Sequence, residues 1–146
     1  MLSQTIAREG TSAIGVSPAA TTPPRTSGVR RATRIAAAVV AGLFLAFEAY
    51  AHGAWALALV GLLVPDLTML RAVGSHHAPG QLSPRAVPLY NAAHRLWIPL
   101  ALIAAACVPP NLTAPYILGL AWATHILIDR AAGYGLRSAD GFRHPL

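Results

Sequence analysis

Residues 121–130 read Ala121-Trp122-Ala123-Thr124-His125-Ile126-Leu127-Ile128-Asp129-Arg130. A run this apolar is typical of a helix, yet it carries an imidazole, a carboxylate and a guanidinium group. His125 and Asp129 are four residues apart, so a helix presents both on one face. In a membrane such groups are costly to bury and mark candidate functional positions. The stretch therefore indicates a membrane helix with a polar face.

The composition favours lipid as the surroundings of this chain. Of its 146 residues, 55% are hydrophobic and only 11% are charged, against about 25% charged in soluble domains. All 11 basic residues are arginine, and they outweigh the acidic residues to give a net charge of +6. In a membrane protein this excess reflects topology and contact with anionic lipid. We therefore expect one integral membrane domain that contacts the bilayer and no nucleic acid.

The order of polar and apolar segments predicts an all-α fold. Residues 1–33 are rich in Ser, Thr, Ala, Gly and Pro and are expected to form a disordered basic tail. The domain, residues 34–146, holds four apolar segments at about 35–50, 54–70, 88–108 and 113–131. Each is close to the ~17–25 residues that a spanning helix needs. Turn-forming residues separate the segments, which predicts four transmembrane helices in an antiparallel bundle.

The arginines in the connections predict the orientation. They precede the first segment, lie between the second and third, and follow the fourth: Arg25, Arg30, Arg31, Arg34, Arg71, Arg85, Arg137 and Arg143. The other two connections contain none. Because basic loops stay on the cytoplasmic side, both termini are expected in the cytoplasm, with the protein in the cell membrane. An alternative is that the first segment is a signal peptide cleaved near Ala49-Tyr50-Ala51.

This topology places ionisable groups from three helices at one depth. Asp66 lies near the cytoplasmic end of the second helix, and Pro65 before it loosens that helix. His94 and His125 lie about six residues from the same interface on the third and fourth helices. At 1.5 Å per residue, all three are roughly 6–9 Å deep, and Asp129 is one turn closer to water. We expect these residues to share an internal site.

Two interpretations of this site follow from its residue types. Two imidazoles and one or two carboxylates suit zinc, or iron or manganese with further oxygen ligands. An open metal position could activate water for hydrolysis. In this interpretation Asn91 and Arg130 hold substrate or orient the ligands. In the alternative, the same groups form a hydrogen-bonded network that fixes helix packing in a non-catalytic protein, such as an accessory subunit or a small transporter component.

Three motifs add a family resemblance. They are Val64-Pro65-Asp66-Leu67-Thr68-Met69, Leu89-Tyr90-Asn91-Ala92-Ala93-His94, and the run from His125 through Asp129-Arg130 to Gly133-Tyr134-Gly135-Leu136. In this order they resemble the small bacterial membrane proteins grouped as domain-of-unknown-function family 4260. The family has no established activity, and where it typically has Lys this chain has Arg137. The resemblance implies a four-helix membrane protein whose motif positions include the predicted site residues, with Tyr134 a further candidate beside Arg130.

Overall fold

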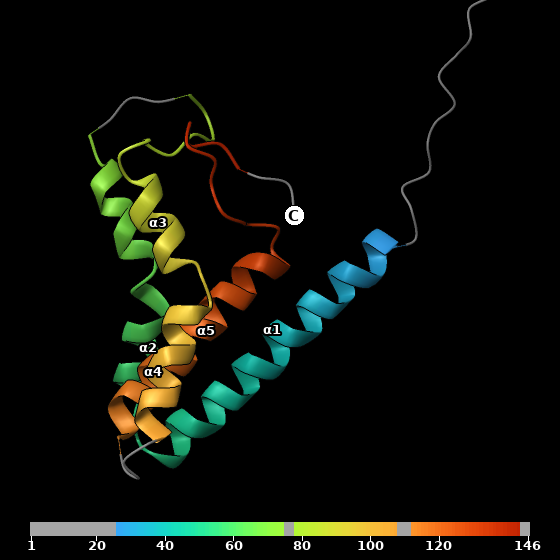
Figure 1. Ribbon diagram of the computed structural model, residues 1–146. Coiled ribbons are helices and arrows are strands. Elements are labelled where there is room, and N and C mark those ends of the chain that lie inside the picture. Colours follow the sequence, from blue (N-terminus) through green and yellow to red (C-terminus); the bar gives the residue numbers. More distant parts are fainter. Residues whose placement is uncertain (1–25, 75–77, 108–111, 144–146) are drawn as a thin grey trace, which may run out of the picture.

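The computed structural model describes residues 26–74, 78–107 and 112–143. Its helices are α1 (Thr26–Ala51), α2 (Trp55–Leu63), the 3-10 helix η1 (Asp66–Ala72), α3 (Val87–Ala93), α4 (Trp97–Cys107) and α5 (Thr113–Ala131) (Figure 1). The described residues contain no β-strand, only an isolated bridge between Arg137 and Arg143. The predicted all-α fold is confirmed.

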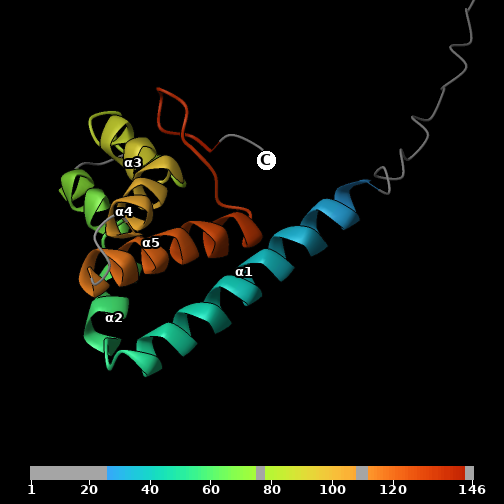
Figure 2. The same cartoon turned by 60° about the horizontal axis from the view of Figure 1, so that its bottom comes forward.

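The helices follow one another as four segments that alternate in direction; each segment is called a pass below, with no reference to a membrane. α1 runs one way, α2 and η1 return, α3 and α4 run in the same general direction as α1 but inclined to it, and α5 returns again (Figures 1 and 2). α5 covers the predicted range 113–131. The prediction of continuous helices over 54–70 and 88–108 is wrong, because each of these passes is divided into two helices.

Proline explains both divisions. Pro65 separates α2 from η1, and it has no backbone N–H with which to continue the helical hydrogen bonding. Its carbonyl accepts hydrogen bonds from the backbone N–H and the hydroxyl of Thr68. Between α3 and α4, Pro99 falls in the first turn of α4, the part of a helix that tolerates a proline. The divisions fall beside Asp66 and His94, so the breaks and the predicted site coincide.

The centre of the structure is α5, which packs against α1, α2 and α4. Small residues allow α2 and α4 to approach α5 closely. A Cβ on Gly61 would lie 2.7 Å from the Ala121 Cβ, and one on Gly119 would lie 2.9 Å from the Pro99 carbonyl oxygen. α1 adds buried Leu45 and Ala49 to the same core. Packing through small residues is typical of helices that associate in membranes.

Only part of the four-span prediction has support from helix length and composition. Among the described residues, α1 alone contains a single straight span, Gly28–Ala51, with mean hydropathy 1.6. α2 and η1 qualify as a second if they count as one span bent by 40°. α1 also begins earlier than expected, so residues 26–33, assigned to the tail, are helical. The rest of the predicted tail, residues 1–25, lies outside the described residues.

The close contact at Gly61 predicts a stability effect. Gly61→Ala should lower the free energy of unfolding by about 1–3 kcal/mol, because the new methyl group must displace Ala121 or the Leu118 carbonyl. Gly42→Ala on α1 is the matched control, since a Cβ there meets nothing within 4 Å. Thermal unfolding of the purified variants measures both, and equal melting temperatures would contradict the packing described above.

Candidate metal centre

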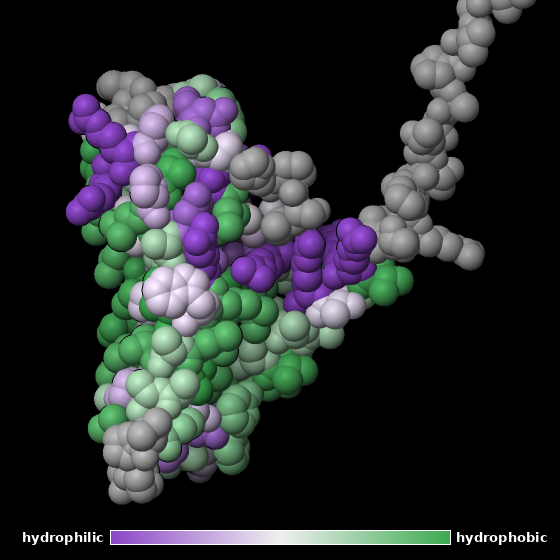
Figure 3. Space-filling model, in the orientation of Figure 1, coloured by the Kyte–Doolittle hydropathy of each residue, from purple (hydrophilic) through white to green (hydrophobic). Residues whose placement is uncertain are grey.

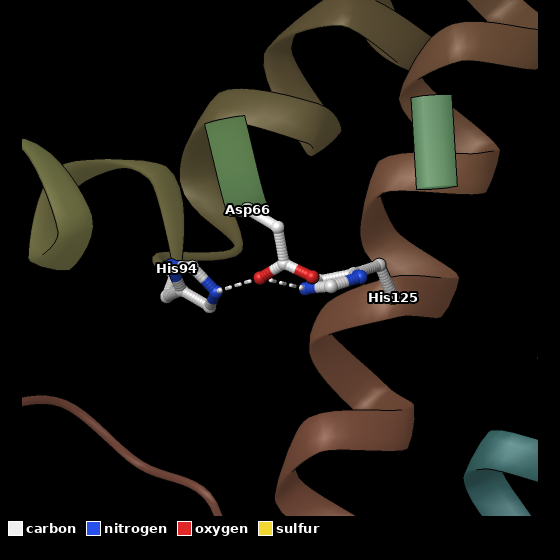
Figure 4. A group of neighbouring side chains, drawn as sticks. All are labelled: Asp66, His94 and His125. Atoms are coloured by element: carbon white, nitrogen blue, oxygen red, sulfur yellow. Dashed lines mark ion pairs between the residues drawn. The ribbon is translucent and has the colours of Figure 1, made fainter. Parts of the chain in front are cut away.

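Asp66 enters the site from the break in the second pass. It is the first residue of η1, directly after Pro65. Its side chain is half-exposed, so its carboxylate is reachable from outside the helix core. The turn at Pro65 therefore directs this carboxylate toward the two imidazoles (Figure 4).

His94 enters from the break in the third pass, where it caps α3. Its side chain is only 4% exposed, and its Nδ1 lies 2.9 Å from the Tyr90 carbonyl oxygen. Because a carbonyl oxygen can only accept, Nδ1 carries the proton, and in the neutral ring Nε2 presents a lone pair. The Tyr90 ring stacks on the imidazole at 3.9 Å. The indole N–H of Trp122 donates to the Ala93 carbonyl at 2.7 Å, which holds this break against α5.

His125 and Asp129 enter from α5, which is unbroken. They are one helical turn apart on the same face, and the His125 Nε2 lies 3.6 Å from the Asp129 Oδ2. The Asp129 side chain is 23% exposed and the His125 side chain 12%. The spacing seen in the sequence thus produces the shared face that was predicted.

The four predicted residues converge on one point. The His94 Nε2 lies 3.9 Å from the Asp66 Oδ1 and 3.4 Å from the Asp129 Oδ2, and the His125 Nε2 lies 3.6 Å from each of these oxygens. Asp66, His94 and His125 each offer a ligand atom within 4.8 Å of the other two. Figure 4 shows both imidazoles turned toward the Asp66 carboxylate.

These distances suit metal ligands better than hydrogen bonds. N–H···O bonds are about 2.7–3.2 Å long, shorter than every imidazole–carboxylate distance here. A tetrahedral ion with ligand bonds of about 2.0–2.2 Å holds its ligand atoms roughly 3.3–3.6 Å apart. Three of the four imidazole–carboxylate distances fall in this range, and the fourth, from His94 to Asp66, is longer at 3.9 Å. Both Nε2 atoms are buried and have no hydrogen-bond partner. Two unpartnered nitrogens that face carboxylate oxygens form a donor set suited to a divalent cation.

The three accompanying residues predicted from the sequence occupy different places. Asn91 exchanges two hydrogen bonds of 2.8 Å with the backbone of Arg137, so it anchors the C-terminal segment. Arg130 and Tyr134 line a cavity of about 290 Å³ that also contacts His94 and Asp129. Only these two are therefore positioned beside the cluster.

The C-terminal segment covers this cavity. Gly133, which has a φ of 87°, follows the last turn of α5. The Tyr134 N–H then donates a hydrogen bond of 2.7 Å to the Asp129 carbonyl. This left-handed glycine cap turns the chain back over the cluster. The turn at Gly141 holds the segment in place, because its carbonyl accepts from the Leu82 N–H at 3.0 Å and a Cβ at Gly141 would clash with Leu82.

Three residues at the site were not recognised from the sequence. Tyr90 stacks on His94, and its place four residues earlier on the same helix is a signal that could have found it. Trp122 stands in the apolar run 121–130 with no role assigned to it, yet its indole N–H holds the α3 break. Arg34 was counted for topology only, yet it lines the cavity. Long-range packing places Trp122 and Arg34, so local spacing could not reveal them.

Comparisons with known proteins identify the family of this chain. Comparison with curated proteins and comparison with solved structures yield no match. A family model described as "Domain of unknown function (DUF4260)" matches residues 30–145, the region that contains every site residue named above. The chain belongs to the family of proteins with domain of unknown function DUF4260.

Proposed function

We propose that this protein is a bacterial inner-membrane metal-binding protein whose site faces the cytoplasm and supports hydrolysis. Asp66, His94 and His125 hold a divalent cation, with zinc the first candidate. Asp129 supplies a fourth oxygen. The observation that carries the proposal is the pair of buried, unpartnered Nε2 atoms turned toward shared carboxylate oxygens.

The electrostatics of the cluster support a bound cation. The His94 Nε2 lone pair faces carboxylate oxygens of Asp66 and Asp129, and lone pairs so placed repel one another. A divalent cation among them turns this repulsion into attraction. The Tyr90 carbonyl that fixes the His94 tautomer is the kind of outer contact that metal-bound histidines generally have.

The surroundings of the cluster support hydrolysis. A bound divalent cation lowers the pKa of a coordinated water molecule, so that a hydroxide nucleophile is available near neutral pH. The cavity of about 290 Å³ beside His94 and Asp129 gives a substrate room to approach. In this proposal Asp129 accepts the proton when water takes its position, and Arg130 and Tyr134 orient the substrate.

The membrane setting rests on surface chemistry. α1 exposes Val39, Val40, Leu43 and Phe47, an apolar face that water would not stabilise. Hydrophilic surface gathers at the end of the molecule that contains the start of α1 and the end of α5, above a mainly hydrophobic body (Figure 3). The 19 residues of α5 extend about 28 Å, close to the thickness of a bilayer core. α1 packs on α5 in the core, which favours its retention over cleavage.

Metal content tests the site directly. Protein purified without chelator should contain about one equivalent of zinc, measured by elemental analysis, and apoprotein should take up the same amount. His94→Ala and His125→Ala should each weaken zinc affinity by more than about 100-fold, because loss of a ligand costs more than loss of an outer contact.

His52→Ala is the matched control for these variants. His52 lies at the end of the molecule opposite the cluster, where its Nε2 is 3.4 Å from the Glu48 carboxylate. Its replacement should leave zinc binding unchanged. A folded wild-type protein that neither retains nor takes up a divalent metal would refute the metal site. In that case a lower melting temperature of His94→Ala would support the structural, non-catalytic role of the cluster.

Labelling of single cysteines tests the topology. Cys107 is the only cysteine in the sequence, so Cys107→Ser provides a background without thiols. In this background, His52→Cys should react with a membrane-impermeant maleimide in intact cells, whereas Ala139→Cys should react only after lysis. Both positions are exposed, which makes the pair comparable. Labelling of Ala139→Cys in intact cells would contradict cytoplasmic termini.

A further inference from the structure

We infer that Arg34 and Arg130 bind the phosphate group of an anionic lipid, and that phosphorylated lipids are the substrate class of the metal site. The evidence for phosphate binding is the two arginines and the hollows that they line. The assignment of phosphorylated lipids as substrates rests on the proposed hydrolytic function.

The two arginines lie where three hollows meet. One is the cavity beside His94 and Asp129; the second is an apolar groove between α1 and α5; the third lies against the end of α5 at Ala131–Gly133. Arg34 and Arg130 line all three. A group bound between these side chains would therefore contact both the site and the groove.

The charge of these arginines is not balanced within the described structure. Among the described residues, neither guanidinium group has an ion-pair or hydrogen-bond partner, although both side chains are partly buried. Asp129, next in sequence to Arg130, lies beside the two histidines instead. Guanidinium groups match the geometry of phosphate oxygens and bind them through paired hydrogen bonds. A phosphate group supplies the counter-charge that this position needs.

The groove explains why a lipid fits better than a soluble phosphate. Its volume is about 370 Å³, and beyond the arginines it is lined mainly by apolar side chains, among them Val29, Ala37 and Leu127. An acyl chain can lie along such a surface while its phosphate stays at the arginines. The N-terminal half of α1 and the C-terminal end of α5 thus together provide the charge and the apolar wall of one amphiphile site.

The shared cavity then brings the phosphate ester toward the metal ligands. In hydrolysis the water oxygen forms a bond to phosphorus, the P–O bond to the leaving alcohol breaks, and a water proton ends on the alcohol oxygen. Asp129 is placed to carry that proton, and the arginines to neutralise charge on the phosphate oxygens. No oxidant or second substrate is required.

Binding of three matched ligands tests the inference. Zinc-loaded protein in a neutral detergent should bind the phosphonate analogue of dioctanoyl phosphatidic acid, whose P–C bond is not hydrolysed, more tightly than dioctanoylglycerol, which lacks the phosphate, or inorganic phosphate, which lacks the chains. Arg34→Gln and Arg130→Gln should each weaken binding of the phosphonate analogue by about 10- to 100-fold, because each removes charge-assisted hydrogen bonds. Arg85→Gln, an exposed arginine outside these hollows, is the control and should bind as the wild type does.

Zinc content measured on the same samples separates this inference from the proposed function. Variants with full zinc content are folded, so weaker lipid binding by them supports the arginine site. Unchanged binding of the phosphonate analogue by Arg34→Gln and Arg130→Gln would overturn it, even if zinc binds. Equal affinity for dioctanoylglycerol would exclude phosphate recognition, and equal affinity for inorganic phosphate would exclude a lipid ligand. Absence of zinc from the wild type would refute the proposed function, and the same comparison of ligands and variants on the zinc-free protein would still test the arginine site.

Discussion

The close packing of α2 and α4 on α5 is the constraint on which the rest of the structure depends. At Gly61 and Gly119 the backbones approach so closely that a single methyl group would collide with the neighbouring helix. This contact brings the breaks of the second and third passes to the level of His125. If these helices stood further from α5, Asp66 and His94 would be too far from His125 and Asp129 to form one cluster with them.

The breaks give the site its chemistry as well as its position. An α-helix directs its polar backbone groups along its own axis, whereas a break frees carbonyl groups and redirects side chains. At the first break the Thr68 hydroxyl satisfies the Pro65 carbonyl, and at the second the Trp122 indole satisfies the Ala93 carbonyl. Each break thus turns a ligand inward without leaving these carbonyls unpaired in an apolar interior.

The sequence predicted more of the site than of the helices around it. The depth argument brought Asp66, His94, His125 and Asp129 together, and in the structure these four side chains lie side by side. Their role as metal ligands stays a prediction. The division of the third pass was missed because Pro99 lies five residues after His94, and no glycine or proline marks the break itself at His94-Arg95-Leu96. Arg34 was missed because its contacts depend on the angle between α1 and α5, which local spacing does not encode.

The four residues of the proposed metal site are held in two different ways, and this difference affects which ions the site would bind. His125 and Asp129 belong to one continuous helix, so the distance between them is set by the helical repeat. Asp66 and His94 stand at hinges between short helices, where small changes in backbone torsion move a side chain without moving a whole pass. One side of the site is therefore rigid and the other adjustable. In the proposed metal site, the adjustable side would accommodate ions of different radius, and the fixed pair would set the preferred coordination geometry.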